Sequence, residues 1–203
     1  MKYLEVDGPE KIVYKGTIFE IVKQPMKIDG KKKFFEIARR SPGVRLIIIK
    51  ENQLLITKEF RSELNRYDYR LPGGKVFDTL DEYEHHRSQD MVPFALLTLH
   101  HYLIEAAKRE CKEETGLIPK TIKHFATTHA GATILWDLFY FIIDEFENSE
   151  GGQDLEAGEI ITTEWKTVEE VKKMCTEGDI SEDRTIGVLF KFFSHYSEKH
   201  LSG

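Results

Sequence analysis

The alternation of apolar and polar residues predicts extended strands over the first forty residues. The run 17–23 is rich in β-forming residues, and Asp29–Gly30 is typical of a turn, after which the extended pattern resumes. Residues 44–49 read as an apolar run typical of a buried strand, and Glu51–Asn52 turns the chain into a second strand over 53–57. We therefore expect an N-terminal β-module followed by a buried sheet.

Farther along the chain, helices alternate with strands. Residues 78–92 are polar and lack a clear period, which predicts an irregular segment. Apolar residues at helical spacing then predict a long helix over 94–115, which Gly116 ends. Further strands are predicted over 122–127, 136–143 and 160–165, and further helices over 168–176 and 182–196. This mixture of elements predicts an α/β fold around a mixed sheet.

Composition excludes several classes of protein. The chain has 203 residues, of which 40% are hydrophobic and 32% charged, as expected for one α/β domain or one domain with a small appendage. A net charge of −6 argues against nucleic-acid partners, and the apolar runs are too short for a membrane partner. Two separate cysteines, Cys111 and Cys175, make no disulfide framework, and no secretory signal precedes them. We expect a cytoplasmic location.

Three carboxylates on the long helix are the strongest chemical signal. Glu110, Glu113 and Glu114 are spaced i, i+3 and i+4, so they leave one side of the helix. Like charges at this spacing repel each other and favour a bound cation, and carboxylate oxygens suit Mg²⁺ or Mn²⁺. Alternatively, Arg109 pairs with Glu105 and Glu113 in a solvated ladder of ion pairs. Spacing alone leaves both interpretations open.

The same segment resembles the signature of the Nudix hydrolases. Residues matching its second half are Arg109, Glu110, Cys111, Glu113, Glu114, Gly116 and Leu117, and a Gly73–Gly74 turn precedes them. The first half departs, because 35 positions separate Gly74 from Arg109 and the first glutamate of the pattern is missing. This separation implies an inserted segment at about 78–100. The resemblance implies an α/β/α sandwich around a mixed β-sheet and Mg²⁺-dependent hydrolysis of a nucleoside diphosphate linked to another group.

The flanking segments resemble the branch of ADP-ribose pyrophosphatases and related nucleotide-sugar hydrolases. Segments that carry this likeness are 14–19, 37–44, 54–61, 69–76 and 177–185. The branch implies a small N-terminal β-strand module at 1–43, used for dimerisation and substrate contacts. It implies a hydrolase domain at 44–203 that contains the insertion. A homodimer is therefore expected.

The resemblance also implies roles for individual residues. The expected metal ligands are Glu110, Glu113, Glu114 and the Gly73 carbonyl. The expected catalytic carboxylates are Glu156 as first choice and Glu159 as second, both in the acidic loop 151–159, together with Glu113. The expected substrate contacts are Arg40 and Arg61 for phosphates, and Phe19 or Phe34 for stacking on a base.

The predicted function is Mg²⁺-dependent hydrolysis of a nucleoside diphosphate sugar, with ADP-ribose as first choice, to a nucleoside monophosphate and a sugar phosphate. The loop 128–136 lacks the glutamate that the branch often carries, so the preferred sugar stays open. One alternative is another nucleotide sugar, such as GDP-mannose. Other classes are a non-catalytic nucleotide-sensing regulator and a generic α/β domain with a charged helix.

Overall fold

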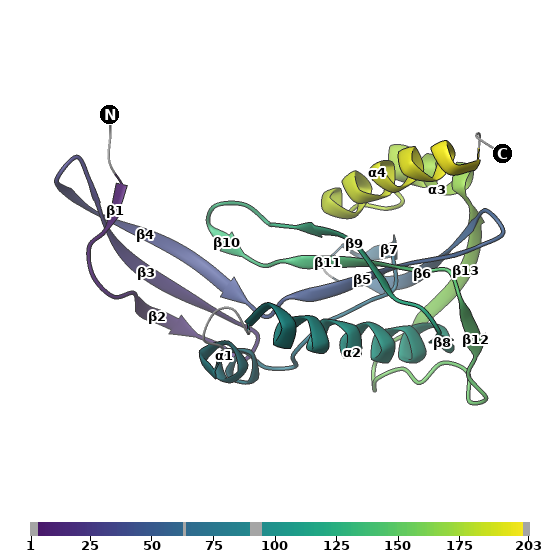
Figure 1. The fold of residues 1–203 in the computed structure, drawn as a ribbon, viewed down its shortest axis with the longest axis horizontal. Helices are drawn as coiled ribbons and strands as arrows, with labels where there is room; N and C mark the ends of the chain where they lie inside the picture. Colours follow the sequence, from purple (N-terminus) through teal and green to yellow (C-terminus); the bar gives the residue numbers. More distant parts are fainter. Residues whose placement is uncertain (1–3, 63, 90–94, 201–203) are drawn as a thin grey trace. The chain divides into compact units, whose positions relative to one another are not determined.

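The computed structural model describes residues 4–62, 64–89 and 95–200 (Figure 1). The chain folds into two compact units, each assembled from three separate segments. The first unit consists of Met1–Gly43, Lys75–Tyr102 and Thr127–Leu138, and the second of Val44–Gly74, Leu103–Ala126 and Phe139–Gly203. The predicted division into a module at 1–43 and a hydrolase domain at 44–203 stays a prediction.

The first unit is built on a five-stranded sheet whose centre is a long hairpin. Its strands are β1 (Leu4–Val6), β2 (Lys11–Lys15), β3 (Phe19–Ile28), β4 (Lys31–Arg40) and β10 (Ile134–Leu135). Strands β3 and β4 pair antiparallel, and Asp29 and Gly30 turn between them with positive φ angles of 51° and 75°. The predicted turn and extended N-terminal segment are therefore confirmed.

The prediction of an irregular segment over 78–92 is wrong for most of its length. Residues Leu80–Gln89 form helix α1 in the first unit. Its polar sequence has almost no apolar face, so periodicity could not reveal it. Tertiary contact supports the helix instead, since Leu80 is fully buried and its N–H donates to the Thr17 carbonyl at 2.9 Å.

The second unit contains the larger sheet, which holds most of the apolar core. Strands follow the order β13-β6-β5-β11-β9, and β7 pairs with β6. Their bounds are β5 (Gly43–Lys50), β6 (Gln53–Arg61), β7 (Arg66–Arg70), β9 (Lys123–Thr128), β11 (Leu138–Ile143) and β13 (Ile161–Thr167). Strands β8 (Leu117–Pro119) and β12 (Phe146–Asn148) form a separate pair. The buried strand predicted at 44–49 is confirmed as β5.

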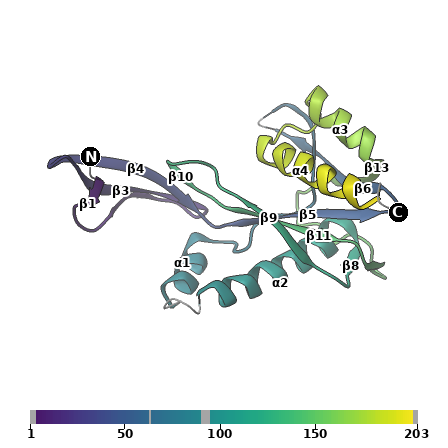
Figure 2. The same ribbon diagram turned by 45° about the horizontal axis from the view of Figure 1, so that its top comes forward.

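Helices lie on both sides of this sheet (Figure 2). They are α2 (Ala95–Thr115), α3 (Val168–Glu177) and α4 (Asp183–His200), close to the predicted ranges. Within the second unit, the C-terminal half of α2 covers one side of the sheet, and α3 and α4 cover the other. This arrangement confirms the predicted α/β sandwich. Among the described residues, no helix has the length and apolarity needed to cross a membrane.

Candidate metal and catalytic site

The last two turns of α2 place two carboxylates beside the glycine turn of the second unit, with Glu110 buried and Glu114 half-buried. Glu110 is only 9% exposed, and burial raises its pKa. Glu114 accepts a hydrogen bond from the Gly73 N–H at 2.7 Å through Oε2. Burial raises the pKa of Glu114 to about 8, and the neighbouring charge of Glu110 adds to the effect. Because the pKa values of both carboxylates are raised, a positive charge beside them would stabilise their ionised forms.

Glu113, the third carboxylate of the series, lies at the rim of the site. Its side chain is 30% exposed and lies 3.6 Å from Arg109, measured from Oε2 to Nε. Arg109 also donates to Oε1 of Glu110 at 3.0 Å through Nη2. The ion-pair interpretation therefore holds in part, because one arginine bridges two of the glutamates. Arg109, together with the charge of Arg45 that acts on Glu114, supplies two positive charges against three carboxylates, so the site stays electronegative.

The Gly73–Gly74 turn fits against these carboxylates only because both residues lack a β-carbon. A β-carbon on Gly74 would lie 2.6 Å from both carboxylate oxygens of Glu110. Gly73 has a φ of 136°, and a β-carbon there would lie 2.3 Å from the Val44 carbonyl oxygen. The Gly73 carbonyl, an expected metal ligand, accepts a hydrogen bond from Arg45 at 2.8 Å. Its metal role stays a prediction that would use the second lone pair.

We expect Gly74→Ala to fold but to lose most of its activity. The new methyl group meets the flexible end of the Glu110 side chain rather than backbone, so the carboxylate moves and the fold tolerates the change. Activity should fall by roughly 10–100-fold, as for other changes that misplace metal ligands. Thermal melting and steady-state kinetics check both parts. Wild-type activity in this variant would contradict the placement of Glu110 in the site.

The acidic loop after β12 is attached to the C-terminal end of α2 by hydrogen bonds to its last carbonyls. The N–H of Asp154 donates to the Glu113 carbonyl at 2.9 Å, and that of Ser149 donates to Gly116 at 2.8 Å. The side-chain amide of Gln153 donates to the Glu114 carbonyl. Such end carbonyls have no partner within their own helix. Satisfying them fixes the loop over the carboxylates.

The two loop carboxylates proposed for catalysis, Glu156 and Glu159, differ in how their charges affect the pKa values of the helix glutamates. The charge of Glu159 helps to raise the pKa values of Glu110, Glu113 and Glu114, and the charge of Glu156 raises the pKa of Glu113 more strongly than Glu159 does. Oε2 of Glu159 accepts a hydrogen bond from the Glu156 N–H at 3.1 Å, which steadies its side chain. The structure thus brings Glu159, the second choice from sequence, electrostatically close to all three helix carboxylates.

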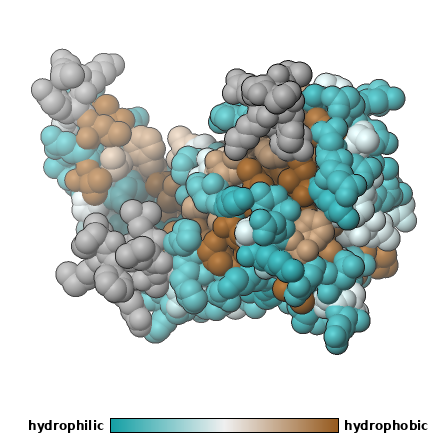
Figure 3. Space-filling view, turned by 45° about the vertical axis from the view of Figure 1, so that its right-hand side comes forward, coloured by the Kyte–Doolittle hydropathy of each residue, from teal (hydrophilic) through white to brown (hydrophobic). Residues whose placement is uncertain are grey.

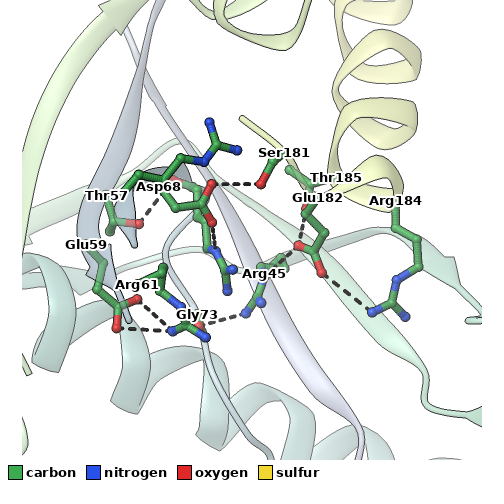
Figure 4. A network of polar contacts seen from close by, with 12 residues as sticks. Arg45, Thr57, Glu59, Arg61, Asp68, Gly73, Ser181, Glu182, Arg184 and Thr185 are labelled. Atoms are coloured by element: carbon green, nitrogen blue, oxygen red, sulfur yellow. Dashed lines mark hydrogen bonds and ion pairs between the residues drawn. The ribbon is translucent and has the colours of Figure 1, made fainter. Parts of the chain in front are cut away.

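Arg45 is a functional candidate that the sequence analysis missed. Its side chain is 9% exposed and contacts both the glycine turn and the N-terminal end of α4 (Figure 4). Nη1 donates to the Gly73 carbonyl at 2.8 Å, and Nε lies 3.3 Å from Oε2 of Glu182. A signal was available, because Arg45 interrupts the run 44–49. A charged residue in a buried strand needs partners.

Glu182, which accepts a hydrogen bond from Arg45, is expected to make the stability of the fold depend on pH. Burial by itself raises its pKa, but the charges of Arg45 and Arg184 and a hydrogen bond from Thr185 outweigh burial and hold the pKa below 4.5. The ionised form is therefore favoured in the folded state. Its contribution is complete above the unfolded-state pKa and is lost as the pH falls through the folded-state pKa.

We therefore expect Glu182→Gln to lower the free energy of unfolding at pH 7 by roughly 2 kcal/mol. The difference from wild type should shrink as the pH falls from 5 towards 3, since the wild-type carboxylate is then protonated too. Urea denaturation at several pH values measures it. A difference that does not change with pH would show that the Glu182 charge plays no part.

The other predicted substrate contacts divide between the two units. Arg61 lies in the second unit, where Nη1 contacts both oxygens of Glu59 at 3.1 Å (Figure 4). Arg40 lies in the first unit with its guanidinium 4.3 Å from the ring centre of Trp136. Phe19 and Phe34 are exposed residues of the same unit. The substrate roles of all four stay predictions.

The donor chemistry of the site suits a hard divalent cation. Across residues 4–62, 64–89 and 95–200, no three acidic, histidine or cysteine side chains already stand in a metal-binding cluster. However, Glu110 is buried and Glu114 half-buried, the pKa values of both are raised, and Gly74 leaves room at the Glu110 oxygens. Oxygen donors of this kind prefer Mg²⁺ or Mn²⁺. The residues present therefore fit such an ion.

Comparison with known proteins gives a family match, a similar curated protein and similar solved structures. A model of the NUDIX domain matches residues 99–186. The CMP-5'-(N-acetyl-N-hydroxy-3-aminopropyl)phosphonate hydrolase of Streptomyces rubellomurinus is 21% identical over 183 residues, which cover 89% of this chain and 78% of that protein. The crystal structure of an ADP compounds hydrolase matches with a TM-score of 0.67 and 14% identity over 95% of this chain and 96% of that chain. This likeness shows a shared fold.

Proposed function

Because the chain contains a Nudix hydrolase domain, we propose that it hydrolyses the pyrophosphate bond of a nucleoside diphosphate sugar, with ADP-ribose as first choice. The observation that carries this proposal is the contact of the Gly73–Gly74 turn with Glu110 and Glu114. That contact reunites two parts of the signature that the insertion separates in sequence. The products would be a nucleoside monophosphate and a sugar phosphate.

The chemistry assigns a separate task to each group of residues. Glu110, Glu113 and Glu114 would hold Mg²⁺, or Mn²⁺, which neutralises phosphate charge and lowers the pKa of bound water. Glu159 accepts the proton of the attacking water, with Glu156 as the alternative. Arg61 holds the substrate phosphates, since a planar guanidinium matches two phosphate oxygens. No step requires a covalent bond between enzyme and substrate.

A second candidate is a nucleotide joined to a phosphonate. The relative from Streptomyces rubellomurinus is named for a CMP-linked phosphonate, and the loop 128–136 of this chain has no carboxylate. A phosphonate carries the same anionic oxygens as a phosphate, so the same carboxylates and arginine would serve. This candidate shares the reaction type and differs in the leaving group.

A substrate panel tests these proposals. ADP-ribose, GDP-mannose, other nucleotide sugars and a CMP-linked phosphonate are incubated with Mg²⁺, and phosphorus NMR identifies the products. We expect one substrate class to release a nucleoside monophosphate, and chelation by EDTA to stop the release. Binding of a nucleotide without turnover would favour the regulator. No binding and no response to Mg²⁺ would favour the generic domain.

The exposed N-terminal strands support a homodimer. Leu4 and Val6 are 59% and 68% exposed, and register places them on one face of the sheet with Ile28 and Met26. Figure 3 shows apolar residues at the surface of these strands. Exposed apolar area of this kind marks an interface. We expect a dimer in sedimentation, and a monomer after Leu4→Glu and Val6→Glu together. Unchanged sedimentation of the double variant would contradict this interface.

A further inference from the structure

The Gly73–Gly74 segment lies alongside β5, but its backbone hydrogen bonds to that strand do not use the Gly73 carbonyl. The Leu46 N–H donates to the Pro72 carbonyl at 2.8 Å, and the Val44 N–H donates to the Gly74 carbonyl at 2.9 Å. Between these two bonds, the Gly73 carbonyl has no backbone partner on β5 among the described residues. Its partner is the side chain of Arg45, which reaches it from the strand itself.

Because both residues are glycines, the conformation of this peptide group depends on its hydrogen bonds to other residues. Two consecutive glycines allow many backbone conformations, and Gly73 adopts one with a positive φ that other residues avoid. The Gly73 N–H, one peptide earlier, is the group that donates to Glu114. The Gly74 Cα, which follows, faces the Glu110 carboxylate. Any rotation of the peptide between them would move both contacts.

Arg45 is itself held in place from two sides. Its Nη1 also donates to the Val44 carbonyl at 3.2 Å, and its Nε is paired with Glu182 just before α4. The guanidinium is rigid and planar, so these contacts fix the direction of its bond to Gly73. A continuous path therefore runs from Glu182 through Arg45 and Gly73 to Glu114.

We propose that Arg45 is a positioning residue for the metal-binding carboxylates. It fixes the Gly73–Gly74 peptide, and through it the hydrogen bond that orients Glu114 and the surface against which Glu110 lies. This inference rests on the proposed function, because it assigns Arg45 to the same site. Groups that orient metal ligands from outside the coordination shell commonly affect metal affinity strongly.

The test compares wild type with Arg45→Gln and Arg45→Lys as full-length proteins. Mn²⁺ binding is measured by electron paramagnetic resonance of the free ion, beside melting temperature, kcat and KM. We expect Arg45→Gln to weaken Mn²⁺ binding and to lower kcat by about 10–100-fold each, with a much smaller change in KM. Arg45→Lys should recover part of both losses, since its ammonium can donate to the Gly73 carbonyl.

Arg70→Gln is the matched control, because Arg70 pairs with buried Asp68 on the same sheet but makes no described contact with Gly73. It should lose stability while keeping its Mn²⁺ affinity. Should Arg45→Gln fail to fold, the double variant Arg45→Gln and Glu182→Gln is used instead. It replaces both members of the ion pair, so neither charge is left buried without a partner. Mn²⁺ affinity and kcat equal to wild type in a folded variant would overturn the positioning role alone. Wild type that neither binds Mn²⁺ nor hydrolyses any nucleotide would overturn the proposed function as well.

Discussion

Glu114→Gln is expected to be nearly inactive and still folded. The substitution keeps the shape of the side chain but removes the ionisable carboxyl group that accepts the hydrogen bond from the Gly73 N–H. Hydrolysis should fall by roughly 10²–10³-fold, the usual loss when one preorganised charge-stabilising group leaves an active site. Without metal, the melting temperature near pH 7 should equal that of wild type, because a pKa of about 8 leaves Glu114 mostly protonated and glutamine resembles the neutral acid. Kinetics with the best substrate of the panel and thermal melting measure the two effects.

The control for this variant is Glu169→Gln, the same chemical change on an exposed turn of α3, where Glu169 pairs only with Lys172 among its described contacts. That protein should keep wild-type kinetics, since exposed ion pairs contribute little. The metal assignment is rejected if Glu114→Gln turns over substrate as fast as the control. A protein that unfolds on this substitution would contradict the expectation for stability.

Glu159→Gln is expected to lose nearly as much activity by a different route. A general base contributes typically about 10²–10⁴-fold, so kcat should fall within that range. The Glu156→Gln variant should lose less, because the Glu159 charge raises the pKa values of all three helix glutamates. Steady-state kinetics of both variants at several pH values measure the difference.

A measurement of metal binding distinguishes the general-base role of Glu159 from the metal-binding role of the helix carboxylates. Glu159→Gln should still bind Mn²⁺, whereas Glu114→Gln should bind it weakly. A larger loss in Glu156→Gln than in Glu159→Gln would reverse the assignment and restore the order that the sequence favours.

Local sequence predicted most of the regular elements correctly. The long helix α2, the hairpin turn at Asp29–Gly30 and strand β5 all follow from patterns a few residues long. These elements carry their own signals, because periodicity and turn residues act over short distances. Helix α1 was missed for the complementary reason. It has no amphipathic face, and its position depends on contact with the N-terminal strands.

For the candidate site too, the sequence predicted some features and the structure was needed for others. Spacing alone placed Glu110, Glu113 and Glu114 on one side of a helix, and the structure refined this by burying Glu110, joining Glu114 to the glycine turn and leaving Glu113 30% exposed. Spacing could not show that an arginine inside β5 reaches the glycine turn. Nor could composition rank two glutamates that stand three residues apart in one acidic loop.

The sequence by itself determined the chemistry available to this protein: three carboxylates in a fixed helical register, followed by Gly116 and an acidic loop. Only the tertiary structure decided which groups meet. Gly73 and Glu114 are 41 positions apart in sequence, yet the Gly73 nitrogen lies 2.7 Å from Oε2 of Glu114. The physical reason is that backbone periodicity fixes neighbours within one element, whereas contacts between elements depend on how buried surfaces pack and pair their polar groups.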